Sequence, residues 1–259
     1  MAVELRGVTG TDPNDRPRPP YGLLRGASLF LDFDGTLVDL APTPGEVEVG
    51  EPLRALVAGL HDRLGGRIAI VSGRPLAEIA AFLHPVALPI GGSHGLELRL
   101  PGGSLDTPSR PEGLDKALAR MHALAADWPG VLVEEKPLGA ALHYRGAPQA
   151  EAACRRLAAE AADVTGLALQ PGKMVFELKP AGGDKGRALG LFMADPLFAG
   201  THPVFLGDDL TDEAGFAAAA AAGGAGILVG EARATAARFR LDGVAAARAW
   251  LTEEAEALA

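Results

Sequence analysis

Short runs of apolar residues alternate along most of this chain with longer stretches of mixed apolar and polar residues. The clearest runs are SLFL at 28–31, IAIV at 68–71 and PVFL at 203–206. Continuous runs of this length are typical of buried parallel strands. The mixed stretches at about 51–64 and 75–83 start at or near a proline, which is favourable in the first turn of a helix. The alternation predicts an α/β domain built on a parallel sheet.

The pattern changes between about Pro108 and Pro180. The segments expected there are a helix at 112–127, strands near 131–135 and 140–144, a helix at 148–163, and strands near 167–170 and 174–178. A helix followed by two strands, repeated once, favours an antiparallel sheet with two helices on one face, and hence a separate inserted module. The predicted fold class is therefore α/β, with a Rossmann-like core around a parallel sheet and an inserted α/β domain with an antiparallel sheet. We assign residues 1–25 to a flexible lead-in, 26–108 and 180–259 to the core domain, and 109–179 to the inserted domain.

Composition narrows the class of protein. The chain has 259 residues and a formal net charge of −9, which argues against nucleic acid as a partner and requires local cations to hold any anionic substrate. No apolar stretch reaches the ~18 residues that a bilayer-spanning helix needs. The N-terminus lacks the basic-then-apolar pattern of a secretion signal. We therefore expect a cytoplasmic protein with no membrane partner.

Two carboxylates, Asp32 and Asp34, follow directly after the first apolar run, and Gly35 permits a tight turn there. Because alternate residues of a strand share a face, both side chains are expected to project to the same side. Two acids this close do not both stay ionised comfortably without a cation between them. The pattern indicates either a divalent metal site or a pair in which one acid is a nucleophile and its neighbour transfers protons. A strand-end turn with two solvated acids is the alternative.

Polar residues also follow the other predicted strands. The strand-end groups are Asp32 with Asp34, Ser72 with Arg74, Ser93 with His94, and Asp208 with Asp209. Ligands of open parallel sheets gather beyond the carboxyl ends of the strands, so we expect these groups to converge. Together with Asp212 the acids form an oxygen-rich pocket of the kind that selects Mg²⁺, and the lack of clustered Cys or His argues against zinc.

Two further residues suit an anion. Ser72 follows a buried strand on a turn made tight by Gly73, and it either presents its hydroxyl to a phosphate or caps the next helix. Lys185 lies at a predicted helix start, where a cation opposes the helix dipole. This placement indicates a fixed charge directed at an anion.

These residues, in this order, resemble the four motifs of the haloacid dehalogenase superfamily. The motifs are DFDGT at 32–36, Ser72 after the second strand, Lys185, and GDDLTD at 207–212. The resemblance implies that Asp32 is a nucleophile forming an aspartyl-phosphate and that Asp34 acts as general acid, then base. It also implies that Ser72 and Lys185 hold the phosphoryl oxygens. The implied Mg²⁺ ligands are Asp32, the main-chain carbonyl of Asp34, and Asp208, with Asp209 and Asp212 in support.

Other segments are similar to the trehalose-6-phosphate phosphatases of that superfamily. They are GGSHGLE at 91–97, VEEK at 133–136, HYR at 143–145, GKMVFELKP at 172–180 and GDDLTDE at 207–213. In that family the inserted module is a cap that closes over the disaccharide. The residues that match its sugar-gripping positions are Glu134, Lys136, Arg145, Lys173 and Glu177.

The residues themselves leave the inserted module's role open. Glu134 and Lys136 share a strand face, as do Lys173 and Glu177. Such mixed charges suit sugar hydroxyls, or they are cross-strand ion pairs on a small sheet. His94 either caps its turn or lines the substrate site, and Arg74 binds the substrate or pairs with an acid near the metal.

The resemblance implies a Mg²⁺-dependent phosphatase that hydrolyses trehalose 6-phosphate to trehalose and phosphate. One alternative keeps the chemistry on another sugar phosphate, such as sucrose phosphate or glucosylglycerate phosphate. Another is a non-catalytic sugar-phosphate-binding partner of a synthase, and a phosphomutase would also use Asp32. We expect a stand-alone enzyme, a monomer, in functional pairing with a trehalose-phosphate synthase.

Overall fold

The computed structural model describes residues 16–41 and 46–258. These residues form two compact units. The core unit comprises the described residues up to Leu105 together with those from Asp184, and the inserted unit is Asp106–Gly183. The part of the predicted lead-in at 1–15 lies outside the described residues.

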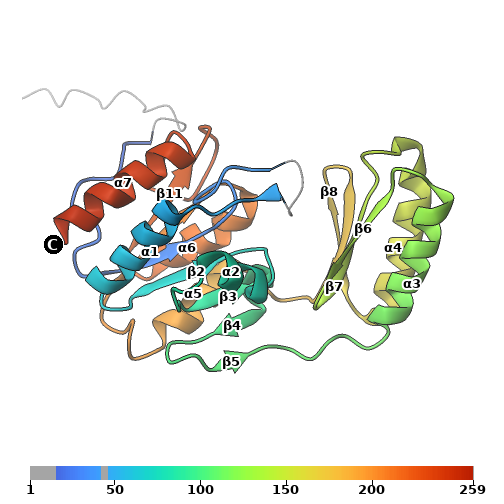
Figure 1. Ribbon diagram of the computed structural model, residues 1–259, viewed down its shortest axis with the longest axis horizontal. Coiled ribbons are helices and arrows are strands. Elements are labelled where there is room, and N and C mark those ends of the chain that lie inside the picture. Colours follow the sequence, from blue (N-terminus) through green and yellow to red (C-terminus); the bar gives the residue numbers. More distant parts are fainter. Residues whose placement is uncertain (1–15, 42–45, 259) are drawn as a thin grey trace, which may run out of the picture. The chain divides into compact units, whose positions relative to one another are not determined.

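The core unit is built on an eight-stranded sheet (Figure 1). Its strands, in spatial order, are β12 (Phe239–Leu241), β11 (Ala225–Val229), β10 (His202–Gly207), β1 (Ala27–Leu31), β2 (Ile68–Val71), β3 (Ile90–Gly92), β4 (Glu97–Arg99) and β5 (Leu105–Asp106). The pairs from β12 through β3 are parallel, and β3 pairs antiparallel with β4. The predicted α/β class with a mostly parallel core sheet is confirmed.

Helices cover both faces of this sheet. They are α1 (Glu51–Arg63), α2 (Leu76–Leu83), α5 (Lys185–Met193), α6 (Glu213–Ala221) and α7 (Val244–Ala257). Alternate side chains of β1 enter different cores: Leu29 and Leu31 pack in the cluster that holds residues of α1, α2 and α7, whereas Phe30 packs with residues of α5 and α6. A strand buried on both faces is mostly apolar, which explains the nearly continuous runs in the sequence, with Ser28 as the buried polar exception in β1.

The described part of the predicted lead-in is bonded to the C-terminal helix. Glu254 of α7 is fully buried, and its carboxylate accepts hydrogen bonds from the main-chain N–H groups of Gly22 (2.5 Å) and Leu24 (2.8 Å). Arg18 pairs with Glu253 at 2.7 Å. Within residues 16–25, several groups thus have defined hydrogen-bond partners, although the sequence indicated a flexible segment. The local sequence does not indicate these partners, because the anchoring acid lies more than 200 residues away in the chain.

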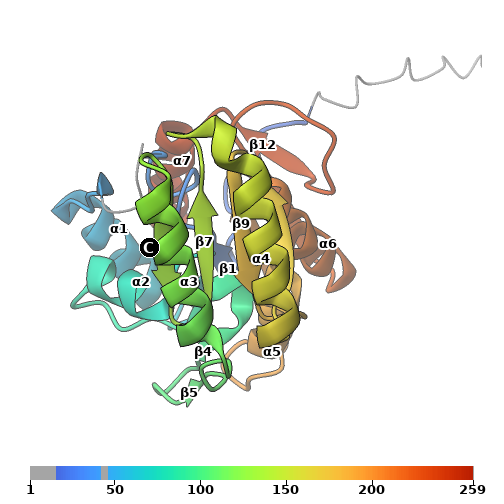
Figure 2. The same ribbon diagram turned by 90° about the vertical axis from the view of Figure 1, so that its right-hand side faces the viewer.

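The inserted unit is a four-stranded antiparallel sheet with two helices. The elements are α3 (Leu114–Asp127), β6 (Leu132–Lys136), β7 (Gly139–His143), α4 (Glu151–Thr165), β8 (Ala168–Gly172) and β9 (Val175–Lys179), and the sheet order is β6-β7-β9-β8. Figure 2 shows α3 and α4 side by side across one face of the sheet. The predicted helix-strand-strand repeat is confirmed, and the face without helices carries polar side chains.

None of the helices in the described part of the chain has the length and hydropathy needed to cross a bilayer.

Candidate active site

Four neighbouring strands of the core sheet place the predicted site residues along one edge. β10, β1, β2 and β3 are adjacent and parallel, so their carboxyl ends lie together. The residues that follow these ends are Asp208, Asp32, Ser72 and Ser93. The predicted convergence of strand-end groups is what the topology produces.

Three carboxylates meet at this edge. Asp32, Asp208 and Asp212 each offer an oxygen, and these atoms all lie within 4.8 Å of one another. Asp32 is 4 % exposed and Asp212 is fully buried. We call these three residues the acid cluster. Asp209 does not belong to it: its exposed side chain accepts a hydrogen bond from the Thr211 N–H and caps the turn at Leu210–Asp212.

Gly35 is required for the close approach of the two loops that carry the acids. Its φ is +75°, and a Cβ placed there would lie 2.1 Å from Asp208 Oδ2. Any other residue would be strained in this conformation and would also displace the carboxylate. The glycine of the DFDGT motif therefore both permits the turn and leaves room for the carboxylate of Asp208.

Lys185 is buried against the acid cluster. Its Nζ donates to Asp32 Oδ1 at 2.7 Å and to Asp212 Oδ1 at 2.6 Å, and its side chain is 3 % exposed. The preceding residue, Asp184, caps α5 by accepting a hydrogen bond from the Arg187 N–H. This cap fixes where α5 begins and therefore where Lys185 lies. The cation that opposes the helix dipole is thus placed between two acids.

Burial and crowding shift the protonation equilibria of all four groups. Burial raises the pKa of Asp32 well above its usual value, opposed by the charge of Lys185, and burial likewise raises the pKa of Asp212. Burial, then the charges of Asp212 and Asp209, raise the pKa of Asp208 to about 6. Burial alone would lower the pKa of Lys185, but the charges of Asp32 and Asp212 raise it above its usual value. The lysine is charged, and it leaves the acids incompletely neutralised.

The acid cluster fits a hard divalent cation. All its donors are carboxylate oxygens, and crowded acids with raised pKa values are stabilised when a cation binds between them. The oxygens of Asp212 already accept other bonds: Oδ1 from Lys185, and Oδ2 from the N–H groups of Asp208 (2.9 Å) and Asp209 (3.0 Å). Asp32 accepts from Lys185 through Oδ1 and, at the longer distance of 3.5 Å, from Thr36 Oγ1 through Oδ2, so Asp32 and Asp208 have more capacity than Asp212 to hold a metal ion directly.

Asp34 has a different partner from Asp32. Arg74 Nε donates to Asp34 Oδ2 at 2.6 Å, and Nη2 donates to Oδ1 at 2.8 Å, which is a bidentate pair. Arg74 also contacts Glu78 at 3.1 Å and lies over the ring of Phe82. Of the two roles predicted for Arg74, the structure contains the ion pair with an acid beside the cluster.

Ser72 and His94 occupy adjoining turns. Ser72 is 1 % exposed, and its Oγ accepts from the N–H of Arg74 at 3.2 Å, while Pro75 takes the capping position of α2. His94 has left-handed backbone angles (φ 58°, ψ 33°), and its N–H donates to Ser72 O at 2.9 Å. A Cβ on Gly73 would lie 2.7 Å from His94 Cε1, so the ring rests on that turn.

Three of the five residues that match the family's sugar-gripping positions, Glu134, Lys136 and Glu177, form an ion network on the face of the sheet without helices. Lys136 Nζ donates to Glu177 at 2.5 Å and lies 3.8 Å from Glu134. His143 Nε2 lies 2.9 Å from Glu134 Oε2. Sequence reasoning gave His143 no role of its own. The sequence did offer a signal for a role of His143: it lies two residues before Arg145, on the strand β7 that pairs with the strand carrying Glu134.

Arg145 and Lys173 lie in turns and not on strands. The Tyr144 N–H donates to Met174 O at 3.0 Å, which brings the residues on either side, Arg145 and Lys173, to the same end of the sheet. Both side chains are exposed. The expectation that Lys173 shares a strand face with Glu177 is wrong, because Met174 has a left-handed φ of 64° and the hairpin turns at these two residues.

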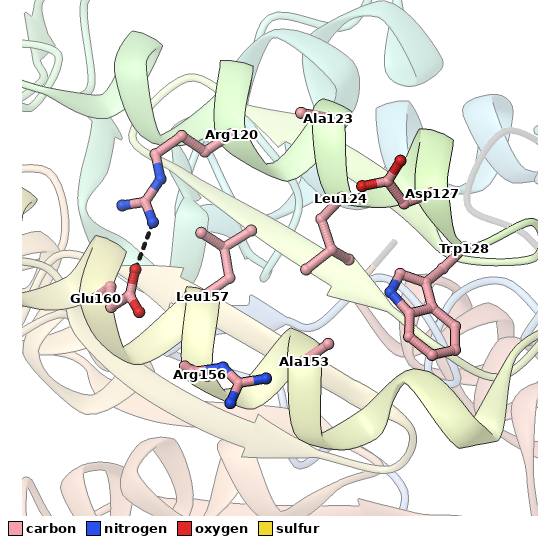
Figure 3. Close-up of a pocket in the computed structure, with 9 residues that line it drawn as sticks. All are labelled: Arg120, Ala123, Leu124, Asp127, Trp128, Ala153, Arg156, Leu157 and Glu160. Atoms are coloured by element: carbon pink, nitrogen blue, oxygen red, sulfur yellow. Dashed lines mark hydrogen bonds and ion pairs between the residues drawn. The ribbon is translucent and has the colours of Figure 1, made fainter.

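A cavity of about 360 Å³ in the inserted unit involves none of the predicted residues. It lies between α3 and α4, lined by Leu124, Trp128 and Leu157 among others, and an Arg120–Glu160 ion pair crosses it (Figure 3). Its lining belongs to the helices and not to the charged face of the sheet. The chemistry of the chain is at the acid cluster.

Comparisons with known proteins agree with this geometry. The family model described as trehalose-phosphatase matches residues 30–245. The trehalose-6-phosphate phosphatase of Escherichia coli is 39% identical over 224 residues, which is 86% of this chain and 84% of that protein. A crystal structure titled as a trehalose-6-phosphate phosphatase related protein superposes with a TM-score of 0.71 at 28% identity, covering 86% of this chain and 95% of that one. A haloacid dehalogenase-like hydrolase from Bacteroides thetaiotaomicron shares the fold, with a TM-score of 0.60 at 14% identity over 86% of this chain and 97% of its own.

Proposed function

The chain belongs to the trehalose-phosphatase family, and we propose that it hydrolyses trehalose 6-phosphate to trehalose and phosphate. The observation that carries the proposal is the buried acid cluster with Lys185 bonded to Asp32 at 2.7 Å. Phosphoryl transfer needs a placed nucleophile and fixed positive charge, and this edge of the sheet supplies both.

Asp32 is the proposed nucleophile. Its Oδ1 is held by Lys185, so the carboxylate has a fixed orientation from which its other oxygen can attack phosphorus. The bond from phosphorus to the sugar oxygen breaks as the bond to Asp32 forms. A covalent aspartyl-phosphate splits one difficult displacement into two easier ones. Lys185 balances the charge that spreads over the phosphoryl oxygens, and the hydroxyl of Ser72 at the next strand end is proposed to hold one of these oxygens.

Asp34 is the proposed proton carrier. In the first step it gives a proton to the departing sugar oxygen, and in the second it takes one from the water that attacks the aspartyl-phosphate. Its carboxylate is 28% exposed and paired with Arg74, in contrast to the buried Asp32.

Mg²⁺ is the proposed metal ion, with Asp32, Asp208 and the main-chain carbonyl of Asp34 as ligands and with Asp212 holding the loop. Mg²⁺ takes one or two carboxylates plus substrate oxygens, which fits the small number of free carboxylates here. When bound it neutralises charge on the phosphoryl group.

The inserted unit is the proposed sugar-binding cap. Glu134, Lys136 and Glu177 present both acceptors and donors on one face, as sugar hydroxyls require. Arg145 and Lys173 add two cations at one end of the same sheet. We propose that these five residues bind the glucose remote from the phosphate, and that a trehalose-phosphate synthase supplies the substrate.

Phosphate release from trehalose 6-phosphate, with and without EDTA, tests the reaction. Asp32→Asn should abolish it, and free trehalose should appear in equal amount to phosphate. Release that survives Asp32→Asn overturns the covalent mechanism. Phosphate that stays on the sugar identifies a mutase, and absence of turnover on every sugar phosphate favours a binding protein.

A substrate panel tests the sugar. Lys136→Ala and Glu177→Ala should lower kcat/KM for trehalose 6-phosphate while p-nitrophenyl phosphate is hydrolysed as before. Glu135→Ala is the matched control, because Glu135 lies on the same strand and bonds His122 of α3 on the helix side. Faster turnover of sucrose phosphate or glucosylglycerate phosphate would replace the proposed substrate and keep the chemistry.

A further inference from the structure

Two loops meet at the carboxyl edge of the core sheet. β10 and β11 are parallel neighbours, with Leu206 opposite Ile227, so the segments that follow them emerge side by side. The segment after β10, residues 208–212, is the acidic loop that carries Asp208. The segment after β11, residues 230–236, contains no acid of the cluster.

Arg233 links the second segment to the acidic loop. Its Nη2 donates to the main-chain carbonyls of Asp209 (2.7 Å) and Asp208 (3.4 Å), and its Nη1 donates to the carboxylate of Glu213. One planar guanidinium therefore bridges two carbonyl oxygens and an acid, which a lysine ammonium does not match in geometry.

Glu213 holds Arg233 in that position. It is the first residue of α6, and its second oxygen accepts from the N–H of Ala236 at 2.8 Å. The two side chains are 24% and 27% exposed, so solvent screens the pair only in part. The arginine is thus fastened to a helix end as well as to the acidic loop.

The bonds fix the peptide groups on both sides of Asp208. Asp212 Oδ2 accepts from the N–H groups of Asp208 and Asp209, and Arg233 donates to the carbonyls of the same two residues. The main chain from which the Asp208 carboxylate projects is held from both directions. Loss of Asp212 would free the N–H groups of this main-chain segment, and loss of Arg233 would free its carbonyl groups.

We propose that Arg233, fastened by Glu213, is a positioning residue that orients Asp208 for the metal ion. The inference rests on the metal site of the proposed function and not on the identity of the sugar. Partners that orient a metal ligand are typically worth 10–100-fold in metal affinity.

A purely electrostatic effect has the opposite sign. Arg233 is a cation beside a cation site, so removal of its charge alone would tighten metal binding. Arg233→Met removes the charge and the bonds, whereas Arg233→Lys keeps the charge and removes the bridge. Positioning predicts weaker binding in both variants, and charge alone predicts tighter binding in the first.

The probe is Mn²⁺, which takes oxygen ligands as Mg²⁺ does and whose free ion is measured by EPR. The full chain is titrated without substrate, so the result is independent of turnover. Arg240→Met is the matched control. Arg240 also bonds the 230–236 segment, through the carbonyl of Gly230 at its start, but its other bond goes to Asp242 and not to the acidic loop.

Both Arg233 variants should raise the Mn²⁺ dissociation constant roughly tenfold, and Glu213→Gln should raise it less, while Arg240→Met should leave it unchanged. Saturating Mg²⁺ should restore phosphate release in the Arg233 variants. Wild-type or tighter Mn²⁺ binding by Arg233→Met overturns the proposal, and so does equal weakening by Arg240→Met. If instead the wild-type chain binds Mn²⁺ but hydrolyses no sugar phosphate, the proposed function fails and this inference stands.

Discussion

Lys185→Met should cost the core unit about 3–5 kcal/mol of unfolding free energy when no metal is present. The lysine is 3 % exposed and bonds Asp32 and Asp212, so its loss leaves two buried carboxylates facing each other without their cation. At about 2–4 °C per kcal/mol for a chain of this size, the melting temperature should fall by roughly 6–20 °C.

The assay is urea unfolding in EDTA, repeated with Mg²⁺. A divalent ion replaces part of the missing charge, so Mg²⁺ should stabilise Lys185→Met more than it stabilises the wild-type protein. Phosphate release should still be lost, because the metal does not replace a donor bonded to Asp32. Lys116→Met, which removes an exposed lysine of α3, is the control and should change little.

A double variant separates charge from packing. Lys185→Met/Asp212→Asn removes the cation together with one of its two acids, and an asparagine carbonyl can still accept from the N–H groups of Asp208 and Asp209. The double variant should therefore be more stable in EDTA than Lys185→Met alone. An unchanged urea midpoint for Lys185→Met, or a double variant less stable than the single one, would show that Lys185 does not stabilise the core unit through its charge.

Other changes have equally defined outcomes. Gly35→Ala should weaken Mn²⁺ binding at least tenfold, since its Cβ would lie 2.1 Å from Asp208 Oδ2; wild-type affinity would contradict this. His143→Leu should raise KM for trehalose 6-phosphate with p-nitrophenyl phosphate hydrolysis unchanged, because the bond to Glu134 is lost, whereas His143→Gln should retain a donor; equal KM values in the two variants would count against it. In EDTA, the stability contributed by Asp208 is present below about pH 4 and lost as the pH rises to about 6, because its folded pKa of about 6 exceeds the ordinary 3.8. Urea midpoints across that range check the trend, and bound Mg²⁺ should remove it.

The core strands could be predicted because each is buried on both faces. β1, β2 and β10 are apolar at nearly every position, and the structure places them within two residues of the predicted ranges. β12, Phe239–Leu241, was missed because three residues carry no usable period and its pairing with β11 is a tertiary contact.

The start of α6 shows how local capping uses the acids of the last motif. A 3₁₀ turn at Leu210–Asp212 precedes α6, and the Asp209 and Asp212 side chains cap it in both directions. The family resemblance implies that Asp209 supports the metal ligands. Its bond to the Thr211 N–H shows that local capping competes for the same side chain.

The identity of the site residues was more predictable than their partners. Strand-end position brings Asp32, Ser72 and Asp208 together once the sheet order is fixed. No pattern in the sequence indicates that the particular acid paired with Arg74 is Asp34. Nor does any pattern indicate that Arg233 donates to the carbonyl of Asp209, 24 residues earlier in the chain. Such pairings depend on the distance between loops of neighbouring strands, which local sequence does not encode.

The two acids of the first motif differ in environment in a way that suits the two different roles proposed for them. Asp32 is 6% exposed at its side chain and bonds a lysine that is itself buried, so its orientation is permanent. Asp34 is 28% exposed and bonds an arginine shared with the more exposed Glu78. A nucleophile must keep one orientation through both steps, whereas a proton carrier must change its charge and exchange with water between them. One residue separates the two acids in sequence, and each has its own cation: the first pairs with Lys185, which is 3% exposed, and the more exposed second acid pairs with Arg74, which is 10% exposed.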